Sequence, residues 1–183
     1  LLGIARLSIV RRPRTRIVVV GSEFIAIRGS GDAASAREAN SGALAAAVRR
    51  DGGIIESVSV IPDHLDAIGA CLSEPGADLI LLAGGTGWGP DDRVLDALTG
   101  SDIPMIRGVA FRQAPSAGVG WARETLVILL PGSPAACLAA YDVLAARAIR
   151  RFAGESGDWP WRREGVLTRK VSSPLGYVDY IPV

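Results

Sequence analysis

Apolar positions along the chain fall into short continuous runs, separated by segments in which they recur every three or four residues. Continuous runs rich in Val, Ile and Leu are typical of strands buried on both faces, and we predict them at residues 16–20, 54–61, 78–83, 105–111 and 125–130. The helical repeat occurs between these runs, at residues 35–50, 63–72, 91–98 and 134–152. This alternation predicts an α/β fold, a three-layer sandwich around a mostly parallel sheet.

The pattern changes after residue 154. Residues 155–165 are polar and predict a linker. Residues 166–183 contain two short strand-like runs, at 166–171 and 177–181, and predict a short β-rich C-terminal piece, the start of an incomplete β domain. We therefore expect an α/β domain over residues 1–154, in a chain that is part of a longer protein.

Composition narrows the classes of function. With 183 residues and 49% apolar content the chain is expected to fold, and its net charge of +1 with 5% aromatic residues argues against binding of nucleic acid. The apolar start at residues 1–10 is shorter than the roughly 20 residues that span a bilayer, so we predict no membrane segment. Cys71 and Cys137 lack the spacing of a zinc site and are interpreted as buried thiols of a cytoplasmic protein.

Three acidic residues follow the first three predicted strands: Glu23, Asp63 and Asp92. Ligands of open parallel sheets bind outside the carboxyl ends of the strands, so we expect these carboxylates to lie near one another. Carboxylate oxygens suit a hard cation, and we predict Asp63 and Asp92 as ligands of Mg²⁺. The alternative is that Asp63 caps the helix that follows it and that Asp92 only favours the first turn of the next helix.

Two glycine-containing loops end at the same edge of the predicted sheet. Residues 84–89 hold four glycines in six positions, so Gly84, Gly85, Thr86 and Gly87 are expected to bring backbone N–H groups close to an anion. The spacing matches neither a dinucleotide fingerprint nor a P-loop, and a tight turn without a ligand is the alternative. Trp88 is expected either to cover a planar ligand or to pack on the sheet edge.

The second loop, at residues 131–134, precedes the last predicted helix. Gly132 permits close approach of a ligand, and Ser133 stands at the N-cap position before Pro134. We predict Gly132 and Ser133 as a second anion contact, with plain capping of the helix as the alternative.

At these loops the sequence resembles the molybdopterin-binding domain shared by the MoeA/gephyrin and MogA families. The resemblance rests on residues 78–87, on Asp92 and on residues 130–134, and it covers about residues 12–154. It implies molybdopterin as a substrate. MoeA-type members insert molybdate into adenylylated molybdopterin with Mg²⁺, and MogA-type members make the adenylylated form from Mg-ATP.

The resemblance also implies roles for individual residues. Glu23 matches the acid of the T-G-D-E-L motif, Asn40 is the residue retained from D-S-N, and Asp63 and Asp92 match two further acids. Arg112 falls on the first lysine of the K-P-G-K-P motif, whose second lysine is Pro115 here. The resemblance thus implies a catalytic set of Glu23, Asp63, Asp92 and Arg112, with Asn40 and the two loops binding substrate. Arginine supplies charge to an oxyanion but cannot shuttle protons.

Four hypotheses about function follow. The leading one is a MoeA-like domain that inserts molybdate during molybdenum cofactor biosynthesis, and the second is a non-catalytic cofactor carrier or chaperone for a molybdoenzyme. The third is a scaffold that has lost its ligand, and the fourth a MogA-like molybdopterin adenylyltransferase. The resemblance also implies a homo-oligomer, with a molybdoenzyme or another cofactor-biosynthesis protein as a further partner.

Overall fold

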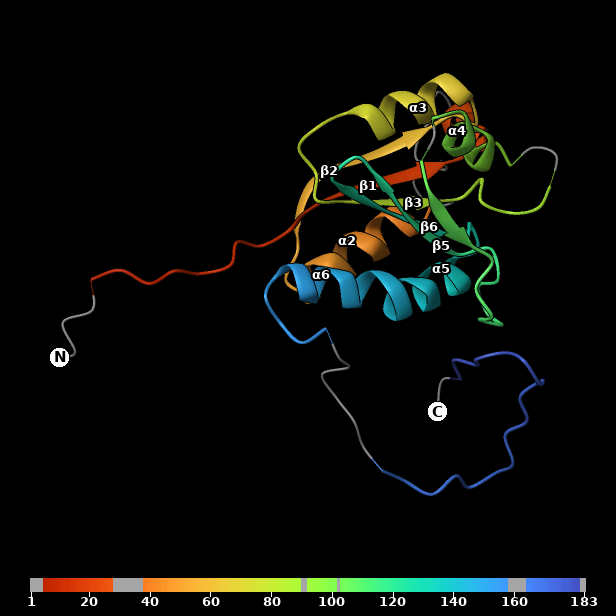
Figure 1. Cartoon of the computed structure of the whole chain (residues 1–183). Coiled ribbons are helices and arrows are strands. Elements are labelled where there is room, and N and C mark those ends of the chain that lie inside the picture. The colour runs from red at the N-terminus through yellow and green to blue at the C-terminus, as the bar shows by residue number, and fades with distance from the viewer. Residues whose placement is uncertain (1–4, 28–37, 90–91, 102, 158–163, 182–183) are drawn as a thin grey trace.

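The computed structural model describes residues 5–27, 38–89, 92–101, 103–157 and 164–181. Its centre is a six-stranded sheet with the spatial order β2-β1-β3-β6-β5-β4 (Figure 1). The first four strands in this order are parallel, and β5 and β4 continue the sheet through antiparallel pairings. The strands are β1 (Arg14–Val20), β2 (Ile54–Ile61), β3 (Leu79–Ala83), β4 (Met105–Arg107), β5 (Gly118–Ala122) and β6 (Thr125–Leu130).

Helices cover both faces of this sheet (Figure 1). Helices α2, α5 and α6 lie on one face, and α3 and α4 lie on the other. This arrangement confirms the predicted three-layer α/β fold. The helices are α1 (Ser22–Ile27), α2 (Asn40–Arg50), α3 (Leu65–Ser73), α4 (Val94–Gly100), α5 (Pro134–Ala140), the π-helical turn η2 (Tyr141–Ala145) and α6 (Ala146–Phe152).

The continuous apolar runs form strands because the core lies on both faces of the sheet. In β1, Ile17 and Val19 join the cluster under α2, α5 and α6, whereas Val18 and Val20 join the cluster under α3 and α4. Strand β3 alternates in the same way and is buried along its whole length. Successive side chains of a strand point to opposite faces, so a run without polar positions is what a doubly covered sheet requires.

The antiparallel edge of the sheet was not predicted correctly. The run expected at residues 105–111 forms a strand only as far as Arg107, and β5 was missed because Gly118 and Gly120 weaken its strand signal. These glycines allow a close approach of β4. A Cβ on Gly118 would lie 2.8 Å from the carbonyl oxygen of Ile106, and one on Gly120 would collide with the Met105 side chain.

Most predicted helices are confirmed with shifted ends. The helix expected at residues 91–98 begins at Val94, with residue 91 outside the described residues. The helix expected at residues 35–50 is described from Asn40 onward, since positions 35–37 also lie outside. The long last helix is interrupted by η2, a π-helical turn that periodicity does not reveal. No helix in the described ranges is long and apolar enough to cross a membrane.

The described tail, residues 164–181, does not form the two strands predicted for it. Its one β-bridge joins Val178 to Phe111, where the Arg112 N–H donates to the Val178 carbonyl and the Val178 N–H donates to the Ala110 carbonyl. The apolar side chains of Val166 and Leu167 are exposed, so they have no sheet to pack on in the described part of the chain. The assignment of residues 155–165 to a linker and of 166–183 to an incomplete β domain stays a prediction.

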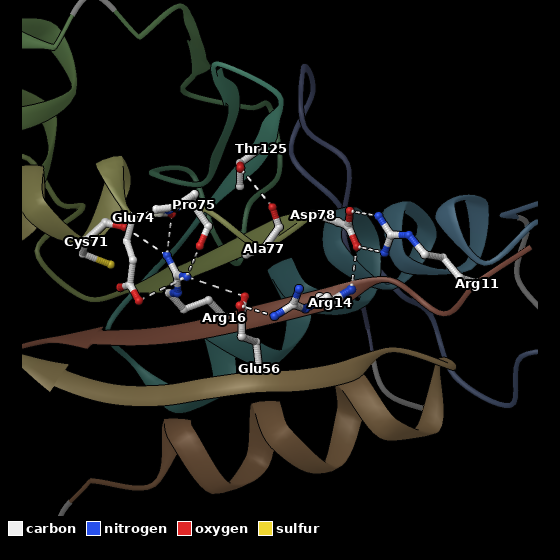
Figure 2. Close-up of polar contacts among 10 residues, drawn as sticks. All are labelled: Arg11, Arg14, Arg16, Glu56, Cys71, Glu74, Pro75, Ala77, Asp78 and Thr125. Atoms are coloured by element: carbon white, nitrogen blue, oxygen red, sulfur yellow. Dashed lines mark hydrogen bonds and ion pairs between the residues drawn. The ribbon is translucent and has the colours of Figure 1, made fainter.

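Arginines form hydrogen bonds near the amino-terminal ends of β1 and β3 (Figure 2). The buried Arg16 donates to the carbonyl oxygens of Cys71, Glu74 and Pro75 at the end of α3, at 2.9–3.3 Å. Arg11 donates to both carboxylate oxygens of Asp78 at 2.6 Å, and these hydrogen bonds lower the pKa of Asp78. The arginines before and within β1 therefore have a structural role in anchoring the strand.

The two cysteines differ in exposure but not in chemistry. Cys137 is fully buried, as predicted, whereas Cys71 is only partly buried. Burial raises the pKa of the Cys71 thiol to about 11 and that of Cys137 to about 12. Both thiols are free and remain protonated at neutral pH, so neither is activated as a nucleophile.

The turn between β5 and β6 carries a backbone conformation that favours glycine. Arg123 has a φ of 55°, in a two-residue turn closed by the pairing of Ala122 with Thr125. We expect Arg123→Gly to raise the free energy of unfolding by about 0.5 kcal/mol, because relief of strain exceeds the entropy that glycine adds to the unfolded chain. Urea denaturation measures this, with Arg123→Ala as the control that keeps the strain. A glycine variant less stable than the alanine variant would contradict the expectation.

Candidate functional site

A pocket of about 360 Å³ opens beyond the carboxyl ends of β1 and β3. It lies where the order of strands reverses, since β2 is beside β1 on one side and β6 is beside β3 on the other. Such a switch point is the usual ligand crevice of an open α/β sheet. The structure brings seven of the predicted site residues to its lining: Glu23, Asn40, Asp63, Gly84, Gly85, Asp92 and Gly132.

Asp63 joins the loops that follow β1 and β2. Its carboxylate accepts a hydrogen bond of 3.0 Å from the backbone N–H of Ser22, and its own N–H donates to the Ser22 hydroxyl at 3.1 Å. The carboxylate thus caps the start of α1, whereas the alternative interpretation from the sequence had it cap α3. Glu23 lies in the first turn of α1, so this contact also places the second carboxylate of the pocket.

Asp92 is held inside the glycine loop. Its carboxylate accepts a hydrogen bond of 2.7 Å from the Gly89 N–H. A Cβ on Gly87 would lie 2.6 Å from the Asp92 carboxylate, and one on Gly89 would lie 3.0 Å from it. Two of the four glycines are therefore needed to accommodate this side chain, a reason that sequence analysis did not supply.

The other two glycines bring the loop against the sheet. Gly84 has a φ of +92° and Gly85 a φ of +60°. A Cβ on Gly85 would lie 3.1 Å from the Asp63 carboxylate, so the absence of a side chain here lets that acid reach the pocket.

Asn40 closes the pocket from the start of α2. Its side-chain amide donates to the Gly132 carbonyl at 2.8 Å, which links α2 to the loop before α5. The side-chain oxygen of Asn40 is buried and has no hydrogen-bond partner within the described ranges. A buried acceptor of this kind fits a ligand that donates a hydrogen bond.

Three predicted contacts lie outside the pocket lining. Thr86 is buried and its hydroxyl donates to the Leu130 carbonyl at 3.1 Å, so the side chain holds the loop to β6. Gly87 lies against the Asp92 carboxylate and does not line the pocket. Ser133 precedes α5 without a side-chain capping bond, and Pro134 occupies the first turn as expected.

Arg112 also lies apart from the residues that line the pocket. Its guanidinium forms an ion pair with Asp179, which accepts a further hydrogen bond of 3.0 Å from the Gln113 amide. Hydrogen bonds from Ser173 and then from Arg112 lower the pKa of Asp179, so this carboxylate is charged at neutral pH. The positive charge of Arg112, which was expected to attract an oxyanion, is therefore paired with the carboxylate of Asp179 in the tail.

Sequence analysis missed Arg107. From β4 its guanidinium donates to the carbonyls of Thr86 and Gly87 and lies 3.9 Å from the centre of the Trp88 ring. Since β4 is an edge strand, this stack agrees with the expectation that Trp88 packs on the sheet edge. The signal that could have found Arg107 is its isolation as the one basic residue in an apolar stretch of residues 103–111.

The pocket has a limited set of ligands for a metal ion. No group of three or more His, Cys, Asp or Glu side chains that could hold a metal occurs in the described part of the chain. Asp63 and Asp92 nevertheless line the same pocket. Mg²⁺ is commonly held by one or two carboxylates together with substrate phosphates, so the two residues fit this cation when a phosphate accompanies it.

Comparison with known proteins identifies the family. A family model described as a probable molybdopterin binding domain matches residues 16–151. The chain therefore belongs to this family of molybdopterin-binding domains, as the loop motifs predicted.

Two curated relatives cover nearly all of this chain. "Molybdopterin molybdenumtransferase 2" of Mycobacterium tuberculosis (strain ATCC 25618 / H37Rv) is 30% identical across 96% of this chain and 45% of its own length. "Molybdopterin molybdenumtransferase" of Bacillus subtilis (strain 168) is 24% identical across 98% of this chain and 42% of its own length. The chain thus spans less than half the length of these relatives.

Solved structures share the fold. A molybdopterin biosynthesis MoeA protein from Pyrococcus horikosii has a TM-score of 0.65 and 21% identity, over 79% of this chain and 36% of that chain. The molybdopterin biosynthesis Mog protein from Mycobacterium ulcerans has a TM-score of 0.59 and 25% identity, over 79% of this chain and all of that chain (100%). The fold is therefore found in solved structures that carry either name.

Proposed function

We propose that the chain is the molybdopterin-binding domain of a MoeA-like protein that inserts molybdate into molybdopterin, free or adenylylated. The observation that supports this most directly is the convergence of Glu23, Asp63 and Asp92 with Asn40 and the two glycine loops in one pocket. The names of the curated relatives, which cover 96% and 98% of the chain, agree with this assignment.

The residues of the pocket divide the work of binding. The N–H groups of Gly84 and Gly89 already donate to Leu130 and Asp92. The remaining backbone N–H groups of the glycine loop hold the phosphate, and the amide group of Asn40 contacts a polar edge of the ligand. Asp63 and Asp92 would hold Mg²⁺ together with that phosphate, and the cation would offset the repulsion between the anionic ligand and the carboxylates. Glu23, exposed in the first turn of α1, orients water or accepts a proton at the open side.

A second candidate function is a cofactor carrier that binds molybdopterin without inserting molybdate. The ion pair of Arg112 with Asp179 favours it, because the arginine expected to attract molybdate already has a counter-charge. We further propose a homo-oligomer located in the cytoplasm, with a molybdoenzyme or another cofactor-biosynthesis protein as its partner.

Titration calorimetry with molybdopterin, with and without Mg²⁺, tests the proposal. In Mg²⁺ we expect Asp63→Asn to weaken binding about tenfold, equivalent to about 1.4 kcal/mol, because one of two metal-binding carboxylates is lost. Without Mg²⁺ the same variant should bind no more weakly than the wild type, since a repelling charge has been removed. Asp66→Asn, an exposed acid on α3 outside the pocket, serves as the control and should leave both affinities unchanged.

The outcomes separate the candidate functions. If the wild type binds no molybdopterin both with and without Mg²⁺, the proposal is refuted. Molybdate-dependent loss of the adenylyl group from adenylylated molybdopterin supports insertion, and binding without this reaction supports a carrier. Turnover of ATP with molybdopterin would instead assign the domain to adenylyl transfer.

A further inference from the structure

Arg107 contacts the glycine loop from a neighbouring part of the sheet. It is the last residue of β4, the short edge strand, and is partly buried. One guanidinium nitrogen, Nη2, donates to the carbonyl oxygen of Thr86 at 2.7 Å and to the carbonyl oxygen of Gly87. The side chain therefore joins a strand to two consecutive peptide groups of the loop.

The third consecutive loop residue, Trp88, packs on the same guanidinium. The central carbon of the guanidinium lies 3.9 Å from the centre of the ring, a close cation–π contact. The Trp88 side chain is 73% exposed, so this stack is a principal contact of an otherwise solvated indole. Arg107 thus fixes residues 86–88 by three contacts from one side chain.

This arrangement has a cost that the contacts must offset. The Nε atom of Arg107 is buried and has no hydrogen-bond partner in the described part of the chain. A buried N–H without a partner costs about 1–3 kcal/mol. The contacts of the guanidinium with the two loop carbonyls and with Trp88 therefore offset the cost of the unpaired Nε.

The captured carbonyls determine where the loop N–H groups point. In a planar trans peptide the C=O and the N–H of the same peptide group point in opposite directions. The Thr86 carbonyl shares its peptide group with the Gly87 N–H, and the Gly87 carbonyl shares its group with the Trp88 N–H. Because Arg107 holds both carbonyls, these two N–H groups point away from its guanidinium. The loop residues on either side of this fixed segment, Gly85 and Gly89, line the pocket.

We propose that Arg107 is a positioning residue that fixes the conformation of the Gly84–Gly89 loop and so sets its affinity for the phosphate of an anionic ligand. The inference rests on the proposed function for the identity of that ligand, molybdopterin. Its structural part, the fixing of the loop, can be tested without any ligand. Arg107 does not need to touch the ligand in this role.

Two substitutions separate hydrogen bonding from charge. Arg107→Gln removes the charge and the cation–π contact, and Arg107→Lys keeps the charge and the cation–π contact but not the planar donor group. Arg93→Gln is the matched control, because Arg93 lies beyond the other end of the loop and its ion pair with Asp96 is a long one of 3.7 Å.

The first readout is the NMR order parameter of the amides of residues 85–89 in the ligand-free protein. We expect values of about 0.85, typical of a rigid backbone, in the wild type and in Arg93→Gln. In Arg107→Gln they should fall below about 0.6, with Arg107→Lys in between. If Arg107→Gln fails to fold, Trp88→Leu, which removes only the stack, should give a smaller decrease in the same amides.

The second readout is calorimetric affinity for molybdopterin in Mg²⁺. We expect Arg107→Gln to bind about tenfold more weakly and Arg107→Lys to recover part of the loss. Unchanged order in the loop, or a disordered loop with unchanged affinity, would overturn the inference. If the wild type binds no molybdopterin, the proposed function fails. The order parameters of Arg107→Gln then decide alone whether Arg107 fixes the loop.

Discussion

Asp51→Asn is expected to lower the free energy of unfolding by about 3–5 kcal/mol, one of the largest effects of any single substitution in this chain. Asp51 is the C-cap residue of α2, and its carboxylate accepts hydrogen bonds from Arg150 at 2.7 Å and from the Tyr141 hydroxyl at 3.0 Å. The Asp51 and Arg150 side chains are each only 6% exposed. Removal of the carboxylate charge leaves the guanidinium of Arg150 buried without a counter-ion, and this uncompensated charge causes the loss.

Burial and the neighbouring Asp51 charge also raise the pKa of Tyr141. The hydroxyl therefore stays protonated and remains a donor at all ordinary pH values. Urea denaturation of Asp51→Asn measures the loss. Asp142→Asn is the control, because its ion pair with Arg50 is more exposed and contributes about 0–1 kcal/mol.

A double variant identifies the cause of the loss. In Asp51→Asn with Arg150→Met the orphaned charge is gone, so part of the stability should return, and the double-mutant cycle should show strong coupling. A single variant no less stable than the Asp142→Asn control would contradict the interpretation of this pair as a buried network.

Gly84→Ala is expected to lower the free energy of unfolding by about 2–5 kcal/mol and to abolish ligand binding in the pocket. Gly84 has a φ of +92°, which side chains rarely adopt, and a Cβ at this position would collide with the Val20 carbonyl oxygen. The Gly84 N–H also donates to the Leu130 carbonyl at 3.1 Å, so the residue cannot move away without loss of that bond. The ends of three neighbouring strands must separate to accept one methyl group.

Thermal and urea denaturation measure this effect. Gly69→Ala in α3 is the matched control, because a Cβ on Gly69 meets nothing within 4 Å. That variant should gain about 0.5–1 kcal/mol, since alanine is the better helix former. A Gly84→Ala protein as stable as the wild type would show that the strand ends are more adaptable than the contacts indicate.

Periodicity predicted the central strands β1, β3 and β6 well because they are buried on both faces, so their apolar runs are almost continuous. The prediction failed at β5, whose Gly118 and Gly120 serve the close approach of β4. It also failed at the tail, where Val166 and Leu167 are apolar but exposed. Apolar sequence indicates a strand only where a partner strand exists, and pairing is not a local property.

The candidate site was predictable as far as it follows from strand ends. Glu23, Asp63 and Asp92 lie in one pocket because the strands before them are parallel. The pairing of Arg112 with Asp179 spans 67 residues, and the contact of Arg107 with Thr86 spans 21. No local sequence pattern links residues so far apart in the chain, so the partners of these two arginines could come only from the structure.

Helix α2 is fastened at both of its ends, through Asn40 to the Gly132 carbonyl and through Asp51 to Arg150. Because both ends are anchored, α2 cannot tilt at one end without breaking the hydrogen bond at the other. The wall of the pocket that α2 forms is thus stationary, and a ligand cannot enter by displacing it. On the opposite side of the pocket the glycine loop is held by Arg107, Thr86 and Asp92, so both walls are in place before a ligand arrives.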